Sequence, residues 1–273
     1  GSTQVAQIIE KTLAQKTGPI TPLVAETGGL NAMIVDSSAL LEQVVNDAMI
    51  SAFGSAGQRC SALRVLFIQK DVYPRFKQLL QGAMSELNIG LPQFLSSDVG
   101  PVIDDEALNN LKAHAKKMKD NYTLIAECEL PQACQNGHFI APLAVEIPSL
   151  SVLEKEEFGP ILHVVTFAAE DLEQVVEQIN DSGYGLTLGV QSRIQETVDY
   201  VRKHAHVGNC YVNRNMIGAV VGLQPFGGEG LSGTGPKAGG PLYLPRLCHE
   251  RTFTVDTTAA GGNASLMSLS DED

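Results

Sequence analysis

The sequence contains no tryptophan, and aromatic residues make up only 5% of its 273 positions. It has no apolar run long enough to span a membrane, because the longest, residues 216–223, is short and contains two glycines. Basic residues are also scarce: 19 Lys and Arg stand against 31 Asp and Glu, so the net charge is −12. The short apolar runs predict no transmembrane segment. Because an acidic chain repels phosphate backbones, we also expect no nucleic-acid partner for this segment.

Cysteine is rare, and its spacing excludes two common uses. No Cys-x-x-Cys pair is present to hold zinc, and a chain of 273 residues can bury a core without disulfides. The N-terminus also lacks the basic and apolar regions of a signal peptide. We therefore expect a reducing, cytoplasmic setting and no metal site. The five cysteines are Cys60, Cys128, Cys134, Cys210 and Cys248.

Apolar residues alternate between helical and strand spacing along the chain. This alternation predicts an α/β fold with a mainly parallel sheet. Asp36 to Ser38 are expected to supply the N-cap of the helix that follows them. Helices are expected over 5–13, 40–53, 71–87, 170–179 and 194–204, and strands over 22–25, 31–35, 63–69, 122–126, 161–167, 186–190 and 207–212.

The first helix follows directly on Gly1, and a short apolar strand comes after it. This order is typical of the second half of a βαβ unit, so we expect part of that unit's sheet to be missing from this chain. The final residues, from 257 onward, are small, polar or acidic, and their composition is typical of a surface-hugging or disordered tail.

Cys60 and Glu26 are the first candidate reactive residues. Cys60 lies in a loop of small residues between a helix and a strand, where Arg59 could favour a thiolate. On local sequence alone, however, a packed free cysteine is the better interpretation. Glu26 follows the expected strand 22–25 and precedes two glycines, which points it into the crevice where α/β folds bind ligands. The alternative is an idle, solvated glutamate in a turn.

Two loops complete the set of candidates. Residues 156–160, Glu-Glu-Phe-Gly-Pro, could offer a carboxylate to ribose hydroxyls and a ring to a flat cofactor. Residues 224–241 are rich in glycine and include a match to the dinucleotide fingerprint G-x-G-x-x-G at 228–233. We reject that match, because Pro225 before it and Pro236 after it leave no strand–helix pair around it. The exposed N–H groups of this loop instead favour an anion such as a carboxylate.

The histidines give weaker signals. His204 and His206 end a helix, where positive charge is favourable, and no third ligand has the spacing of a metal site. His163 alternates with apolar residues in a strand and is expected in the core.

Five motifs in order resemble the aldehyde dehydrogenases. They are Gly-Ser-Thr at 1–3, Glu-Thr-Gly-Gly at 26–29, Gly-Gln-Arg-Cys-Ser at 57–61, Glu-x-Phe-Gly-Pro at 156–160 and Pro-Phe-Gly-Gly at 225–228. Further stretches, 34–39, 54–64, 205–209 and 227–244, and the tail 256–263, resemble the glutamate semialdehyde dehydrogenase half of bacterial bifunctional proline-catabolic enzymes. The resemblance implies a catalytic domain with a mainly parallel sheet and a remnant of a Rossmann-like NAD domain.

The resemblance also implies roles for single residues. Cys60 would be the nucleophile that attacks L-glutamate γ-semialdehyde to give a thiohemiacetal, which passes hydride to NAD and becomes a thioester. Glu26 would be the general base for the hydrolytic water. The implied cofactor-binding residues are Ser2, Thr27, Gly28, Glu156 and Phe158. The implied substrate-binding residues are Ser61, Gly239 and Gly240, with the two glycine amides holding the α-carboxylate.

What the family has and this chain lacks leads to further expectations. The resemblance places an oxyanion-hole asparagine, the first strands of the NAD domain and part of a dimer arm before residue 1. FAD would belong only to the missing proline dehydrogenase half. We therefore expect a fragment with little or no turnover alone, from an intact homodimer that is cytoplasmic, with a peripheral membrane position left open. Expected divisions are 1–28, the end of the NAD domain; 29–235, the catalytic domain; and 236–273, the end of the anchor loop, an oligomerisation segment and the tail.

Three alternatives remain at this point. The chain could belong to an aldehyde dehydrogenase with another substrate. It could be a thiol hydrolase, in which a histidine lies within hydrogen-bond reach of Cys60. It could also be a non-catalytic assembly module that keeps only the fold.

Overall fold

The computed structural model describes residues 1–256. The expected tail from 257 onward lies outside the described residues. Residues 1–240 form one compact unit, and the described residues from Pro241 onward belong to a second, in which a short helix, α7 (Tyr243–Arg246), is found. The expected divisions after residues 28 and 235 remain predictions.

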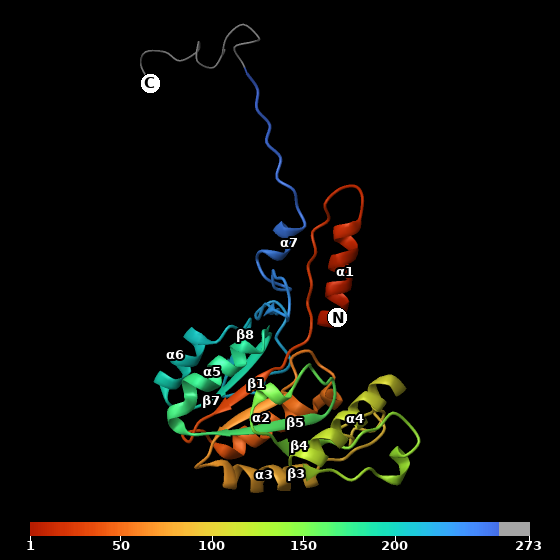
Figure 1. Cartoon of the computed structure of the whole chain (residues 1–273), viewed down its shortest axis with the longest axis vertical. Coiled ribbons are helices and arrows are strands. Elements are labelled where there is room, and N and C mark those ends of the chain that lie inside the picture. Colours follow the sequence, from red (N-terminus) through yellow and green to blue (C-terminus); the bar gives the residue numbers. More distant parts are fainter. Residues whose placement is uncertain (257–273) are drawn as a thin grey trace. The chain divides into compact units, whose positions relative to one another are not determined.

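A mixed, mainly parallel sheet lies at the centre of the first unit (Figure 1). Within the described residues it has seven strands in the order β3-β4-β5-β2-β1-β7-β8, and only β3 and β4 pair antiparallel. This confirms the predicted α/β class. The strands are β1 (Ala32–Val35), β2 (Val65–Gln69), β3 (Thr123–Glu127), β4 (Leu143–Glu146), β5 (Ile161–Phe167), β7 (Thr187–Gln191) and β8 (Asn209–Val212). A separate small sheet pairs β6 (Tyr184–Gly185) with β9 (Glu229–Gly230).

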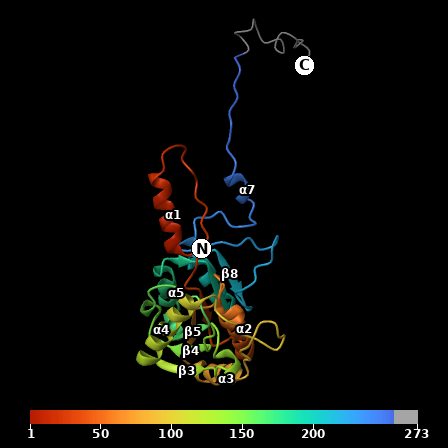
Figure 2. The same cartoon turned by 90° about the vertical axis from the view of Figure 1, so that its right-hand side faces the viewer.

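Helices lie on both sides of the large sheet: Figure 2 shows α4 and α5 on one side and α2 on the other. Every residue of β1 and β2 is buried, as expected for parallel strands covered on both faces. The helices are α1 (Thr3–Gln15), α2 (Leu41–Phe53), α3 (Tyr73–Ser85), α4 (Asp105–Asn121), α5 (Leu172–Asp181) and α6 (Gln195–His204). Of the helices and strands named so far, α4, α7, β4, β6 and β9 were not predicted from the sequence.

Two local predictions are wrong. Residues 22–25 form no strand; Ala25 instead exchanges hydrogen bonds with Thr234, through its N–H to the threonine hydroxyl (2.9 Å) and its carbonyl to the threonine N–H (3.0 Å). The α2 N-cap is Leu40, which has no capping side chain. The Asp36 carboxylate instead accepts hydrogen bonds from the Ser38 N–H (2.8 Å) and from the Ser192 hydroxyl. It thereby links the segments that follow β1 and β7.

The three main candidate loops all lie at the amino edge of the parallel strands. Residues 26–31 lead into β1, Cys60 precedes β2, and Glu156 precedes β5. Because β1, β2 and β5 are adjacent and parallel, these loops meet at one edge of the sheet. The sequence interpretation placed Glu26 at the carboxyl end of a strand; the structure places it before β1, at the opposite edge.

Candidate active site

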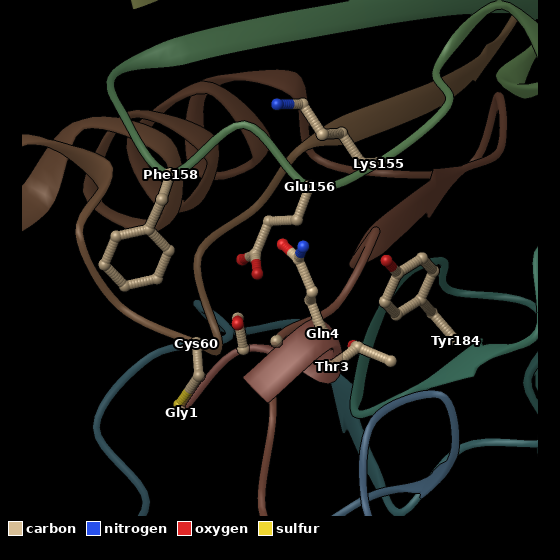
Figure 3. Close-up of a pocket in the computed structure, with 10 residues that line it drawn as sticks. Gly1, Thr3, Gln4, Cys60, Lys155, Glu156, Phe158 and Tyr184 are labelled. Carbon is tan, nitrogen blue, oxygen red and sulfur yellow. The ribbon is translucent and has the colours of Figure 1, made fainter. Parts of the chain in front are cut away.

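A pocket of about 630 Å³ opens at this amino edge (Figure 3). The start of α1 lies against it, and the loops that carry Cys60 and Glu156 form its other walls. Its lining residues are Gly1, Ser2, Thr3, Gln4, Gly28, Cys60, Lys155, Glu156, Phe158 and Tyr184. The pocket therefore brings together five predicted site residues from four separate parts of the sequence.

The Cys60 loop is held in an uncommon backbone conformation. After α2, Ser55, Ala56 and Gly57 have φ angles of 56°, 53° and 66°, in the left-handed region. The buried Asn31 side chain then fixes the end of the loop by donating to the carbonyls of Cys60 (2.6 Å) and Ala62 (2.9 Å). The chain thus turns sharply out of α2 and presents a partly buried thiol before it enters β2.

The electrostatic surroundings of Cys60 do not favour its thiolate. Burial raises the pKa of the Cys60 thiol, the negative charge of Glu156 raises it further, and the backbone N–H of Ser61 opposes both effects. Arg59 does not have its predicted role, because its exposed side chain donates to the Ser55 hydroxyl (2.9 Å). In this state the cysteine is a protonated thiol that an approaching base or substrate has to activate.

Glu156 is the best-anchored acidic group of the pocket. Its Oε1 accepts a hydrogen bond from Nη2 of Arg64 at 2.9 Å. Burial raises the Glu156 pKa, while Arg64 and the backbone N–H of Gly29 oppose the rise. Any side chain at Gly28 would overlap the Glu156 carboxylate, so glycine is required there by close approach. Phe158 is 43% exposed, which leaves its ring available to a ligand.

Glu26 lies outside the lining of this pocket and faces the glycine-rich segment. It forms an isolated β-bridge with Gly233, and a side chain at Gly227 would overlap its carboxylate. Both oxygens of the Glu26 carboxylate are shielded from solvent, and neither accepts a hydrogen bond of good geometry within the described residues. Burial raises the Glu26 pKa; the nearby Gly228 N–H and Lys237 moderate the rise. A carboxyl group with a raised pKa and no fixed partner is suited to exchanging protons.

The predicted anchor glycines lie in a tight turn of the same segment. Gly239 has a φ of 70°, and the Gly240 N–H already donates to the Lys237 carbonyl at 3.0 Å. Lys237 in turn donates through Nζ to the Gly208 carbonyl. The turn therefore presents Gly239 more freely than Gly240.

Several predicted residues are placed near the pocket without lining it. Thr27 is buried and donates its hydroxyl to the Leu231 carbonyl (2.6 Å), and the Ser61 carbonyl accepts from the Thr187 hydroxyl (3.3 Å). Ser2 does line it, and its hydroxyl caps α1 by accepting from the Val5 N–H (3.2 Å). The helix N-terminus therefore opens toward the pocket, where N–H groups favour an anion.

Sequence reasoning missed several residues of the site. Gln4, Lys155 and Tyr184 line the pocket, and Arg64 lies behind it. Gln4 follows the recognised Gly-Ser-Thr motif and Lys155 precedes Glu156, so motif adjacency could have suggested both. Arg64 directly precedes the apolar strand β2, and a charged residue in that position could have suggested a buried, paired cation.

His163 is buried as predicted, and it is paired with a second histidine. Its Nε2 lies 2.9 Å from Nε2 of His114, and its Nδ1 lies 2.9 Å from the Arg64 carbonyl. Because a carbonyl only accepts, the proton is assigned to Nδ1 of His163, and His114 then donates from Nε2. Both imidazoles are held neutral inside the protein.

The aldehyde dehydrogenase family model matches residues 1–253. The chain belongs to the aldehyde dehydrogenase family. It is 56% identical over 259 residues to the bifunctional protein PutA of Klebsiella aerogenes, covering 92% of this chain and 20% of that protein. It is 39% identical over 236 residues to the 1-pyrroline-5-carboxylate dehydrogenase of Geobacillus kaustophilus, covering 85% and 44%. This aldehyde dehydrogenase chain thus spans about a fifth of the PutA relatives and under half of the dehydrogenase.

Solved structures show the same relationship. A crystal structure of bifunctional proline utilization A matches with a TM-score of 0.91 at 55% identity, over 96% of this chain and 26% of that one. A Thermus 1-pyrroline-5-carboxylate dehydrogenase with bound NAD matches with a TM-score of 0.82 at 34% identity, over 90% and 48%. These matches confirm the aldehyde dehydrogenase fold. Within residues 1–256, no helix has the length and apolar character that crossing a membrane requires.

Proposed function

We propose that this chain is the catalytic segment of an NAD-dependent L-glutamate γ-semialdehyde dehydrogenase of proline catabolism. The observation that carries the proposal is the shared pocket of Cys60, Glu156 and Gly28 in a chain whose relatives are named PutA and 1-pyrroline-5-carboxylate dehydrogenase. A cysteine thiol beside a carboxylate that can bind ribose hydroxyls is the arrangement expected of an enzyme that oxidises an aldehyde.

Cys60 would supply the nucleophile. After deprotonation, its Sγ would bond to the aldehyde carbon, and loss of hydride from that carbon would leave a thioester on the sulfur. The neighbouring N–H of Ser61 helps the thiolate form, while Glu156 opposes it. Glu26 would then take a proton from the water that hydrolyses the thioester, a role that suits its raised pKa.

The residues around the pocket fit the nicotinamide and ribose end of NAD. The Glu156 carboxylate would accept hydrogen bonds from ribose hydroxyls, Gly28 leaves room beside it, and the exposed Phe158 ring offers a flat surface. Ser2 and the first turn of α1 would favour the pyrophosphate. NAD, when bound, would supply the hydride acceptor.

The glycine-rich turn would recognise the substrate's α-carboxylate. Gly239 would offer its N–H, with Gly240 shaping the turn by its bond to Lys237 and Ser61 helping from the cysteine loop. A site built for a carboxylate would disfavour simple aldehydes, whose binding would leave these donors unpaired.

The proposal is tested by NADH formation from glutamate semialdehyde, first in the longer natural protein that contains this segment. The variant Cys60→Ser should abolish activity there, while Cys128→Ser, a matched control outside the pocket, should keep it. Activity of the Cys60→Ser protein would contradict the proposal. This chain alone should show little or no turnover, because the family's oxyanion asparagine has no counterpart in it; loss of such a donor costs about 100- to 1,000-fold.

Thiol hydrolysis is less well supported. Within residues 1–256, no histidine donates to or accepts from the Cys60 thiol, and both ring nitrogens of the buried His163 are already engaged. A homodimer of the intact protein, with FAD only in a proline dehydrogenase half, remains part of the proposal.

A further inference from the structure

Arg64 is the most deeply buried charged residue near the pocket, and the reaction proposed above gives it no role. It follows Cys60 by four positions, precedes β2 and is 1% exposed. A fully buried guanidinium is costly unless acceptors surround it. The contacts that stabilise it therefore indicate what it does.

The Arg64 side chain joins two loops of the site. Nη1 donates to the carbonyls of Gly57 (2.8 Å) and Gly159 (3.1 Å). Nη2 donates to the carbonyl of Arg59 (3.2 Å) and to Glu156 Oε1 (2.9 Å). Two of these acceptors lie in the Cys60 loop, and the other two lie in the loop that carries Glu156 and Phe158.

The same guanidinium also lies against the exposed ring of the pocket. Its central carbon is 5.3 Å from the centroid of the Phe158 ring, within cation–π range. Its planar fork can satisfy several acceptors at once, which a lysine ammonium cannot do with the same geometry.

The backbone of Arg64 is fixed as firmly as its side chain. Its carbonyl accepts from the backbone N–H of His163 (3.0 Å) and from Nδ1 of the same residue (2.9 Å). His163 is in turn held by His114. Both ends of Arg64 are therefore tied to β5 and to the loop before it.

We propose that Arg64 is a positioning residue, which orients the Glu156 carboxylate for the ribose of NAD and locks the Cys60 loop to the Glu156–Phe158 loop. The role toward NAD rests on the proposed function. The two-loop lock rests on the contacts alone.

The groups that act on the Glu156 carboxylate are the guanidinium of Arg64, the N–H of Gly29, the N-terminal ammonium of Gly1 and the thiol of Cys60. Without the Arg64 cation, burial acts on Glu156 with much less opposition, so its carboxyl group should hold a proton at higher pH. This change can be observed without cofactor or turnover.

The first test uses this chain and infrared difference spectroscopy of protonated carboxyl groups as a function of pH. Arg64→Gln should keep one carboxyl group protonated to higher pH than wild type does, and the double variant with Glu156→Gln should lose that signal. Arg59→Gln, which removes an exposed neighbouring arginine, is the matched control and should match wild type. An Arg64→Gln spectrum identical to wild type would overturn the proposal.

The second test uses Arg64→Lys, which keeps the charge if Arg64→Gln fails to fold. In the longer natural protein, its affinity for NAD should fall about tenfold to 100-fold, the equivalent of one charge-assisted hydrogen bond, with KM for NAD affected more than kcat. NAD binding equal to wild type would overturn the positioning role. If the wild-type protein bound no NAD, the proposed function would fail, while the infrared result would still decide whether Arg64 acts on the Glu156 carboxylate.

Discussion

The side-chain amide of Asn31 donates to the carbonyl of Cys60 at 2.6 Å, and this hydrogen bond ties the candidate nucleophile to the residue just before β1. The same amide also reaches the Ala62 carbonyl, while Oδ1 accepts from the Thr187 N–H at 3.2 Å. One buried side chain thus connects the entrances of β1, β2 and β7. The reactive loop is held by the central strands of the sheet.

Replacing Asn31 by alanine should destabilise the protein by several kcal/mol. The change leaves the part-buried carbonyl of Cys60 and the buried carbonyl of Ala62 without their donor, at about 1–3 kcal/mol for each unsatisfied group. Chemical denaturation followed by circular dichroism measures the loss. Asn121→Ala, at an exposed position of α4, is the control and should change stability by about 0.5 kcal/mol or less. Equal effects of both variants would contradict the structural role of Asn31.

The alkylation rate of Cys60 should rise with pH through a pKa above that of an ordinary thiol. Burial and the negative Glu156 both disfavour the thiolate, so removing that charge with Glu156→Gln should move the profile to lower pH. Iodoacetamide labelling, read at Cys60 by mass spectrometry, gives the profile. A shift to higher pH in Glu156→Gln would show that Glu156 acts on the thiol in some other way.

Stability should fall as the pH drops below about 6.5, because His163 and His114 stay neutral in the folded protein. Burial lowers the pKa of His163 from 6.5 to about 3, and that of His114 from 6.5 to about 4. The unfolded chain takes up these protons first, so the contribution of His163 is intact above pH 6.5 and is lost toward pH 3. The slope is about 1.4 kcal/mol per pH unit for each such histidine.

Denaturation midpoints between pH 7 and pH 4 check this prediction. His163→Gln should flatten the slope, while His206→Gln, at an exposed position, should leave it unchanged. A wild-type stability independent of pH in this range would rule out the neutral pair.

Gly57→Ala should strongly destabilise the site loops. Gly57 has a φ of 66°, and an added Cβ would lie 2.2 Å from the carbonyl oxygen of Gly159, which is backbone and cannot rotate away. The expected loss exceeds 1 kcal/mol, since both the backbone angle and the contact are unfavourable. Gly82→Ala, with open space on the exposed face of α3, should instead stabilise by up to about 1 kcal/mol. Thermal unfolding of both variants distinguishes the two positions.

Much of the fold could be predicted because its central elements have clear periodicity. The apolar runs of β1, β2, β5 and β7 and the stripes of α2 and α5 appear in the structure close to their predicted bounds. The prediction of a strand at 22–25 was wrong, because an apolar run does not show which segment will hydrogen-bond to it. In the structure, Ala25 exchanges hydrogen bonds with Thr234, far along the chain. The helix α4 was not predicted, although its buried residues Leu108, Leu111, Ala115 and Met118 recur at helical spacing among charged residues.

The sequence identified most residues of the site but not how they are arranged around one another. Motifs brought forward Cys60, Glu156, Phe158, Gly28 and Ser2, and the structure gathers all five around one pocket. Local sequence suggested Arg59 as the cation near the thiol, although Arg64 is the buried one. The choice between two arginines five residues apart depends on which of them faces the loop before β5, and that is decided by the register of β2 and β5.

The two edges of the parallel sheet differ in function, and the effects of substitutions on protein abundance and on activity would show the difference. At the carboxyl edge, Asp36, Ser38 and Ser192 bond to one another and have no place in the pocket. Substitutions there should reduce the amount of folded protein while leaving each folded molecule as reactive as before. At the amino edge, substitution of the exposed Phe158 should alter chemistry in protein that still accumulates, whereas substitution of Asn31 or Gly57 should also reduce the amount of folded protein. When abundance and activity are scored separately, loss of activity per folded molecule should therefore be confined to the amino edge.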